Sequence, residues 1–161
     1  MSARGLWAEA QLGYAFKDKS LLDLALTHRS ASRANNERLE YLGDSFLTFA
    51  IARRLFELRR EDTEGDLSRA RAALVKKSTL AAIGQRLGVD AHLVLGAGGL
   101  RTGGAQRSAI LADAVEALIG AVLLDGGAAA AEAVVDLMFA VELESLPDAA
   151  ALKDPKTRLQ E

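Results

Sequence analysis

Hydrophobic residues recur along this chain every three or four positions, which is the spacing of helices that bury one face. The pattern predicts helices near residues 6–12, 19–27, 36–59, 64–87, 105–124 and 128–142, with short turns near 90–94. No strand pattern is convincing, because the apolar run at 93–95 is too short. The two prolines, Pro147 and Pro155, both follow the last strong helix. We therefore predict an all-α fold.

The predicted helix 36–59 has an acidic face and an apolar face. Its acids Glu37, Glu40 and Asp44 fall within about 60° of one another on a helix that turns about 100° per residue. An apolar stripe, expected to anchor the helix in the core, runs along the opposite face: Leu39, Leu42, Phe46 and Phe49. Taken alone, this pattern is typical of a solvated surface opposite a buried one.

The predicted helix 105–124 is different, because Asp113 and Glu116 lie in a stretch, 109–124, whose other residues are all apolar. The two carboxylates point the same way, about 60° apart, and small neighbours on that face would let a second helix or an ion come close. Those small neighbours are Ala109, Ala112, Ala117 and Gly120. Two like charges packed closely raise each other's pKa or recruit a cation. If the two acidic faces met, they would form an all-oxygen site suited to Mg²⁺ or Mn²⁺.

The composition indicates the size class of the protein and excludes several kinds of site. With 161 residues, half of them hydrophobic, the chain is expected to form one globular domain. It has no cysteine, which excludes disulfides, thiolate zinc sites and cysteine nucleophiles and suits a reducing cytoplasm. The N-terminus lacks the apolar core of a signal peptide, and 109–124 is too short and too acidic to span a membrane. We therefore expect a soluble, cytoplasmic protein.

The two histidines are weaker candidates than the acids. His28 has two interpretations, a general base or ligand on one hand and a structural histidine with local hydrogen bonds on the other. Neither His28 nor His92 follows a glutamate at Glu-x-x-His spacing, which argues against the di-iron four-helix oxidoreductases.

Residues 37–45 (ERLEYLGDS) resemble the signature segment of the ribonuclease III family. Further segments resemble family segments in the same order, from about residue 12 to the end of the chain: 25–30 (ALTHRS), 64–69 (EGDLSR), 108–121 (SAILADAVEALIGA) with Asp125 and Gly126 just after it, and 153–160 (KDPKTRLQ). The resemblance implies a ribonuclease III endonuclease-domain fold, an all-α helical bundle that forms a two-fold homodimer. It also implies metal-dependent hydrolysis of double-stranded RNA in RNA processing and maturation, with cuts in both strands that leave 5′-phosphates and short 3′ overhangs.

The same resemblance assigns four metal ligands: Glu40, Asp44, Asp113 and Glu116. Glu37 and Glu64 match two further acids that line the family's cleft, and catalytic roles fall to Asp44, Glu116, Glu37 and Glu64. Mg²⁺ is the expected ion and Mn²⁺ a substitute, and metal-activated water makes a covalent nucleophile or a small-molecule cofactor unnecessary. Glu64 has a second interpretation as part of a helix start, with Thr63 as N-cap and Asp66 in the reciprocal position, so we expect a supporting role for it.

The net charge of −2 comes from 20 basic and 22 acidic residues. Setting aside the six acids of the predicted site leaves an excess of four positive charges, which permits RNA binding without demanding it. Candidate contacts to RNA phosphates are Arg69, Arg71, Lys76, Lys77, Arg101 and Arg107. For each of them, a solvated basic surface is the more ordinary interpretation. The glycine-rich segment 96–104 is expected to be a flexible loop, either beside the RNA or as a simple connector.

Tyr41 lies between the acidic and apolar faces of helix 36–59 and by itself would be ordinary core. The resemblance assigns this position to a dimer contact that inserts into the partner subunit, so that two acidic sites face one RNA duplex. Residues 1–161 are thus expected to form an endonuclease domain, with 147–161 the start of a linker to a double-stranded-RNA-binding domain that this sequence does not contain. A competing hypothesis is a scaffold dimer that binds double-stranded RNA without cutting it.

Overall fold

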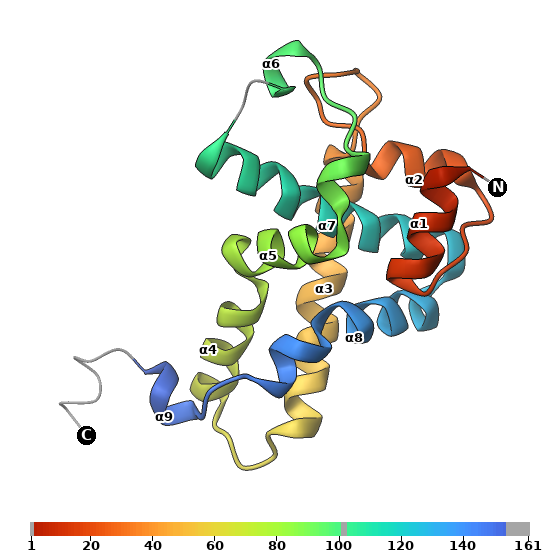
Figure 1. Cartoon of the computed structure of the whole chain (residues 1–161). Helices are drawn as coiled ribbons and strands as arrows, with labels where there is room; N and C mark the ends of the chain where they lie inside the picture. The colour runs from red at the N-terminus through yellow and green to blue at the C-terminus, as the bar shows by residue number, and fades with distance from the viewer. Residues whose placement is uncertain (1, 101–102, 154–161) are drawn as a thin grey trace.

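The computed structural model describes residues 2–100 and 103–153 (Figure 1). Among these residues the helices are α1 (Ala3–Leu12), α2 (Lys19–Ala25), α3 (Glu37–Leu58), α4 (Glu64–Val75), α5 (Lys77–Leu87), the 3₁₀ helix η1 (Val89–His92), α6 (Ala97–Leu100), α7 (Gly104–Gly126), α8 (Ala128–Glu144) and α9 (Ala149–Leu152). Within the same residues, β pairing is limited to one isolated parallel bridge between Thr27 and Val94. The predicted all-α fold is confirmed.

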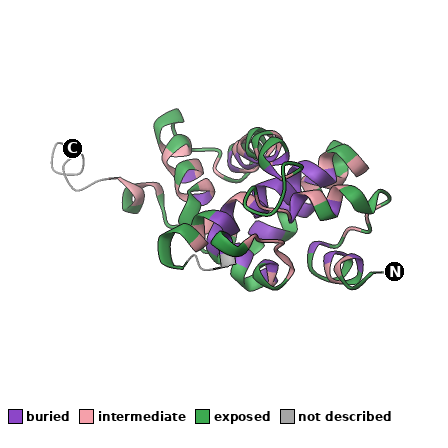
Figure 2. Cartoon of the chain, turned by 90° about the horizontal axis from the view of Figure 1, so that it is seen from above, coloured by how far each residue is buried: buried purple, intermediate pink, exposed green. Residues whose placement is uncertain are grey.

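Helix α7 runs through the centre of the core. From position 110 to position 122 every residue except Asp113 is buried, as expected of a helix that is apolar on nearly all sides. Helices α3 and α5 cover most of α7, and α8 and α2 cover the rest (Figure 1). Buried positions gather in the middle of the molecule and exposed ones on its outside (Figure 2). Neither α7 nor any other helix in the described ranges has the length and hydropathy that a bilayer crossing requires.

The crossing of α3 and α7 depends on two glycines. A Cβ atom on Gly43 would overlap the main-chain carbonyl of Glu116, and one on Gly120 would overlap the carbonyl of Leu39. Glycine at both positions therefore lets the two backbones come into direct contact. Because the backbones are this close, the acids of α3 lie beside the acids of α7.

The end of α7 is fixed to the N-terminal part of the chain by Asp125. Its carboxylate accepts hydrogen bonds from the Tyr14 hydroxyl at 2.6 Å and from the main-chain N–H groups of Lys17 and Asp18 at 2.8 and 2.9 Å. Burial and the bond to Asp125 raise the pKa of Tyr14 to about 12, so the hydroxyl remains a donor at neutral pH. The α1–α2 connection is thereby held against the C-terminal turn of α7.

The predicted single helix 64–87 is wrong, because the chain breaks at Lys76. This residue has φ −64° and ψ 153°, an extended conformation that ends α4 and precedes α5. Across the break, the hydroxyl of Thr79 donates to the carbonyl of Ala73 at 2.9 Å. Helix α4 packs against α3 and α9, whereas α5 packs against α7. Tertiary packing therefore overrides the helix propensity of this segment.

The predicted core stripe of α3 is only partly right. Leu42 and Phe46 are half-buried, and Phe49 is 60% exposed. The buried stripe runs at intervals of four residues: Leu39, Gly43, Leu47, Ile51 and Leu55. The helix is turned so that Gly43 faces α7, which places the acids at the edge of the core and an aromatic face toward solvent.

The predicted flexible loop 96–104 is wrong for its central part, which forms the short helix α6. Just before α6, the N–H of Gly96 donates to the hydroxyl of Ser30 at 3.0 Å. This contact holds the start of the segment against the connection between α2 and α3. Arg101 lies outside the described residues.

Candidate active site

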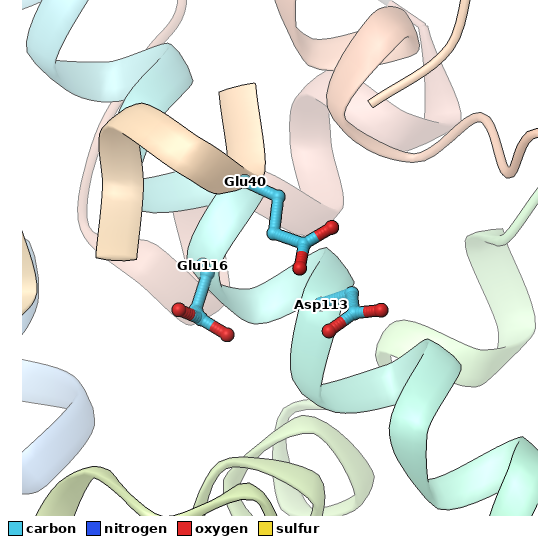
Figure 3. Close-up of side chains that lie close together, drawn as sticks. All are labelled: Glu40, Asp113 and Glu116. Carbon is cyan, nitrogen blue, oxygen red and sulfur yellow. The ribbon is translucent and has the colours of Figure 1, made fainter. Parts of the chain in front are cut away.

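Three carboxylates converge where α3 crosses α7 (Figure 3). Glu40 projects from α3, and Asp113 and Glu116 project from α7. Each offers one oxygen, and these three oxygens lie within 4.8 Å of one another. The fold therefore joins three of the four predicted metal ligands, although Glu40 lies more than seventy positions before Asp113 in the sequence. We refer to these three residues as the acidic cluster.

Burial makes the charged forms of Glu116 and Glu40 less favourable. Glu116 is 1% exposed, and its burial together with the nearby Asp44 carboxyl raises its pKa to about 8. Burial and the neighbouring charge of Asp113 raise the pKa of Glu40 to about 7. A cation bound among these oxygens would favour their charged forms and reverse both shifts.

Two further predicted acids line the same cleft. Glu37 and Asp44 are exposed and border a hollow together with Glu40 and Glu116. Asp44, the fourth predicted ligand, lies close enough to the Glu116 carboxyl to raise its pKa. Five of the six predicted acids are therefore neighbours in the folded chain.

A second hollow adjoins the first and shares Glu37 and Glu40 with it. His28 lines this second hollow, but its Nδ1 lies 2.8 Å from the Ser30 hydroxyl and accepts a hydrogen bond from the Ser30 N–H at 3.1 Å. Burial, followed by the charge of Arg29, lowers the pKa of His28. These local bonds favour the structural interpretation of this histidine.

Lys77 is the member of the site that sequence reasoning missed. Its Nζ donates to Asp113 Oδ1 at 2.6 Å and to Glu116 Oε1 at 2.7 Å, and it lies 3.7 Å from Glu40 Oε1. Although burial opposes it, these bonds raise the pKa of Lys77. The sequence grouped Lys77 with possible RNA contacts, since no pattern marks the break at Lys76 that turns the first residue of α5 toward the acids.

Glu64 lies away from the other five acids. It is the first residue of α4, at the end of α3 opposite to the acidic cluster, and the span of α3 from Asp44 to its C-terminus is roughly 20 Å. The predicted capping box is confirmed: the Thr63 hydroxyl accepts from the Asp66 N–H, and the Asp66 carboxylate accepts from the Thr63 N–H. Within one chain, the observed surroundings of Glu64 are those of a helix start.

The predicted RNA contacts are spread over several elements. Arg69 forms an ion pair with Asp66 at 2.6 Å, and Arg107 forms one with Asp90 at 2.6 Å. Acids of the same chain therefore already neutralise part of both positive charges. The remaining candidates are Arg71, which is half-buried, Lys76, which is exposed, and Arg101, which is not among the described residues. Their contacts with RNA stay predictions.

The donor set of the acidic cluster fits a small divalent ion. Mg²⁺ and Mn²⁺ prefer carboxylate oxygens, and Mg²⁺ needs only one or two of them beside water and substrate phosphate. A cationic group, the Lys77 ammonium, already lies among these oxygens. In the described part of the chain no other group of three ligating side chains lies this close together.

Known proteins resemble this chain over most of its length. The model of a family described as Ribonuclease-III-like matches residues 18–143. Ribonuclease 3 of Pseudomonas fluorescens (strain SBW25) is 54% identical over 153 residues, which cover 95% of this chain and 67% of that protein. Ribonuclease 3 of Vibrio vulnificus (strain YJ016) is 52% identical over 151 residues, which cover 94% of this chain and 67% of that protein. The chain thus spans about two thirds of the length of these relatives.

Solved structures agree with this similarity. The nuclease domain of ribonuclease III from Campylobacter jejuni superposes with a TM-score of 0.80 at 39% identity, covering 87% of this chain and 97% of that one. Dicer from Pichia stipitis superposes with a TM-score of 0.63 at 26% identity, covering 80% of this chain and 57% of that one. The fold and the relatives give one answer: the chain belongs to the ribonuclease III family of endoribonucleases.

Proposed function

We propose that the acidic cleft of this endoribonuclease binds Mg²⁺, with Mn²⁺ as a substitute, and uses it to hydrolyse phosphodiester bonds of double-stranded RNA. The observation that carries the proposal is the convergence of three carboxylate oxygens from two helices within 4.8 Å. The expected products have 5′-phosphates and short 3′ overhangs, as in the processing and maturation of cellular RNA. The same proposal places the activity in the cytoplasm.

Each acid has a distinct part in this proposal. Glu40, Asp113 and Glu116 hold the ion, which when bound supplies a Lewis acid that activates water and neutralises charge on the phosphate. Asp44, which lies beside Glu116 at the edge of the cleft, completes the ligand set. Glu37 extends the negative lining toward solvent, and Glu64 has a supporting role. No side chain of the cleft has to form a covalent bond with RNA.

The chemistry is tested by incubating the purified chain with end-labelled double-stranded RNA at low salt, with Mg²⁺ or with a chelator. We expect short fragments with 5′-phosphates in Mg²⁺ and intact RNA with the chelator, because carboxylates without a divalent ion repel the phosphate. Low salt favours an interface built on phosphate contacts. Fragments that form equally well in the chelator would refute the metal mechanism.

We also propose that the aromatic face of α3 is the contact between two copies of the chain. This face is defined by Tyr41, Phe49 and Phe56, which are 78%, 60% and 72% exposed. Large exposed apolar groups on one helix mark an interaction surface. The nuclease domain from Campylobacter jejuni has a region involved in dimer formation, and a two-fold pair would set one acidic cluster against each strand of a duplex.

Phe49→Arg is expected to weaken this association at least about tenfold, because it buries a charge in an apolar contact. Sedimentation equilibrium at several concentrations measures the change in mass. Leu137→Arg is a matched control, since Leu137 is 51% exposed but lies on α8. Equal dimerisation of both variants would place the contact elsewhere.

A further inference from the structure

The acidic cluster needs positive charge even before a metal arrives. Its three carboxylate oxygens lie within 4.8 Å of one another, and Glu116 is almost completely shielded from water. Charged groups buried this close together without a cation are strongly unfavourable. Among the described ion pairs, those that reach the cluster all come from Lys77.

The Lys77 ammonium contacts two of the carboxylates that would hold a metal ion. Its contacts with Asp113 and Glu116 have the length of strong charge-assisted hydrogen bonds. Mg²⁺ binds oxygen at about 2.1 Å, so an ion on these carboxylates and the ammonium would be close enough to repel each other strongly. The lysine and the metal therefore compete for the same carboxylates.

The Lys77 side chain also has room to leave. It is 57% exposed and extends from the first turn of α5, at the edge of the cleft. Its movement toward solvent requires rotation of side-chain bonds and no change in a helix.

We propose that Lys77 is the resident counter-cation of the metal-free site, and that a divalent ion must displace its ammonium in order to bind. This inference rests on the metal site proposed above. It has two consequences. Lys77 stabilises the metal-free fold, and it makes metal binding weaker than the carboxylates alone would allow.

The test is a Mn²⁺ titration of the metal-free protein, followed by calorimetry, for wild type and Lys77→Met. Methionine keeps an unbranched side chain of nearly the same length and removes its charge. We expect Lys77→Met to bind Mn²⁺ about tenfold more tightly, because no cation has to be displaced. Its thermal midpoint without metal should be lower than that of wild type, and Mn²⁺ should bring the two midpoints together.

Two variants make the result specific. Lys76→Met removes the neighbouring exposed lysine, for which no ion pair is found within the described residues, and should match wild type in both measurements. Lys77→Arg keeps the charge and should bind Mn²⁺ close to the wild-type affinity. Unchanged or weaker Mn²⁺ binding by Lys77→Met would overturn the inference while leaving the metal site intact. An absence of Mn²⁺ binding in every variant would overturn the metal site itself.

Discussion

Glu116→Gln is expected to slow the cleavage of double-stranded RNA by at least about a thousandfold, equivalent to roughly 4 kcal/mol of transition-state stabilisation. Glutamine has nearly the same shape as glutamate, so the substitution removes charge and leaves volume unchanged. Glu116 is the most buried acid of the cluster and shares Lys77 with Asp113, and solvent cannot easily replace its charge. The loss should therefore appear in the chemical step.

Single-turnover cleavage of end-labelled duplex RNA in saturating Mg²⁺ measures this effect, and thermal unfolding checks the fold. The folded state should not suffer, because a neutral side chain at this buried position no longer repels the other two carboxylates. Glu132→Gln is the matched control, since Glu132 pairs with Arg53 on the surface. A folded Glu116→Gln variant with wild-type activity would show that the cluster does not carry the chemistry. Binding without cleavage by the wild-type chain would instead favour the scaffold hypothesis.

Gly43→Ala is expected to lower the free energy of unfolding by about 3 kcal/mol or more. Alanine is a better helix former than glycine by about 1 kcal/mol, so helix propensity alone predicts the opposite sign. The added methyl group would overlap the carbonyl of Glu116, which is part of a backbone and cannot rotate away. Relief requires α3 and α7 to separate, and the acids of the two helices would separate with them.

Chemical denaturation measures the stability change, and Mn²⁺ binding by the folded fraction reports whether the acids have moved apart. Gly65→Ala is the control, because the nearest atom to a Cβ at this position is the Arg69 guanidinium at 3.5 Å. That variant should be as stable as wild type or slightly more so. If Gly43→Ala were as stable as Gly65→Ala, then α3 and α7 could move apart without lowering the free energy of unfolding.

The spacing of apolar residues predicts most of the helices. The predictions that are wrong have local causes. The break at Lys76 carries no proline or glycine, because it arises from α4 and α5 packing against different helices. The exposed Phe49 was expected in the core since a stripe drawn through large side chains ignores Gly43. A glycine that faces a neighbouring backbone has no signature in a pattern of hydrophobic residues.

The sequence identifies the acids of the site, but it does not show which of them come together. Asp113 and Glu116 are conspicuous because every other residue around them is apolar. That Glu40, rather than Glu37 or Asp44, joins them most closely depends on how α3 is turned at the glycine crossing. Neither the distance of Glu64 from the cluster nor the entry of Lys77 can be deduced from spacing, because both depend on where separate helices lie in space.

Because α7 is buried, we expect the acidic cluster to stay folded for as long as the core of the domain stays folded. Amide protons in the middle of this helix are covered by α3, α5 and α8, so their exchange with solvent requires the core to open completely. Two of the three clustered acids, Asp113 and Glu116, belong to this buried segment. We therefore expect heat to unfold the acidic cluster together with the rest of the core, so that loss of metal binding on heating follows cooperative unfolding.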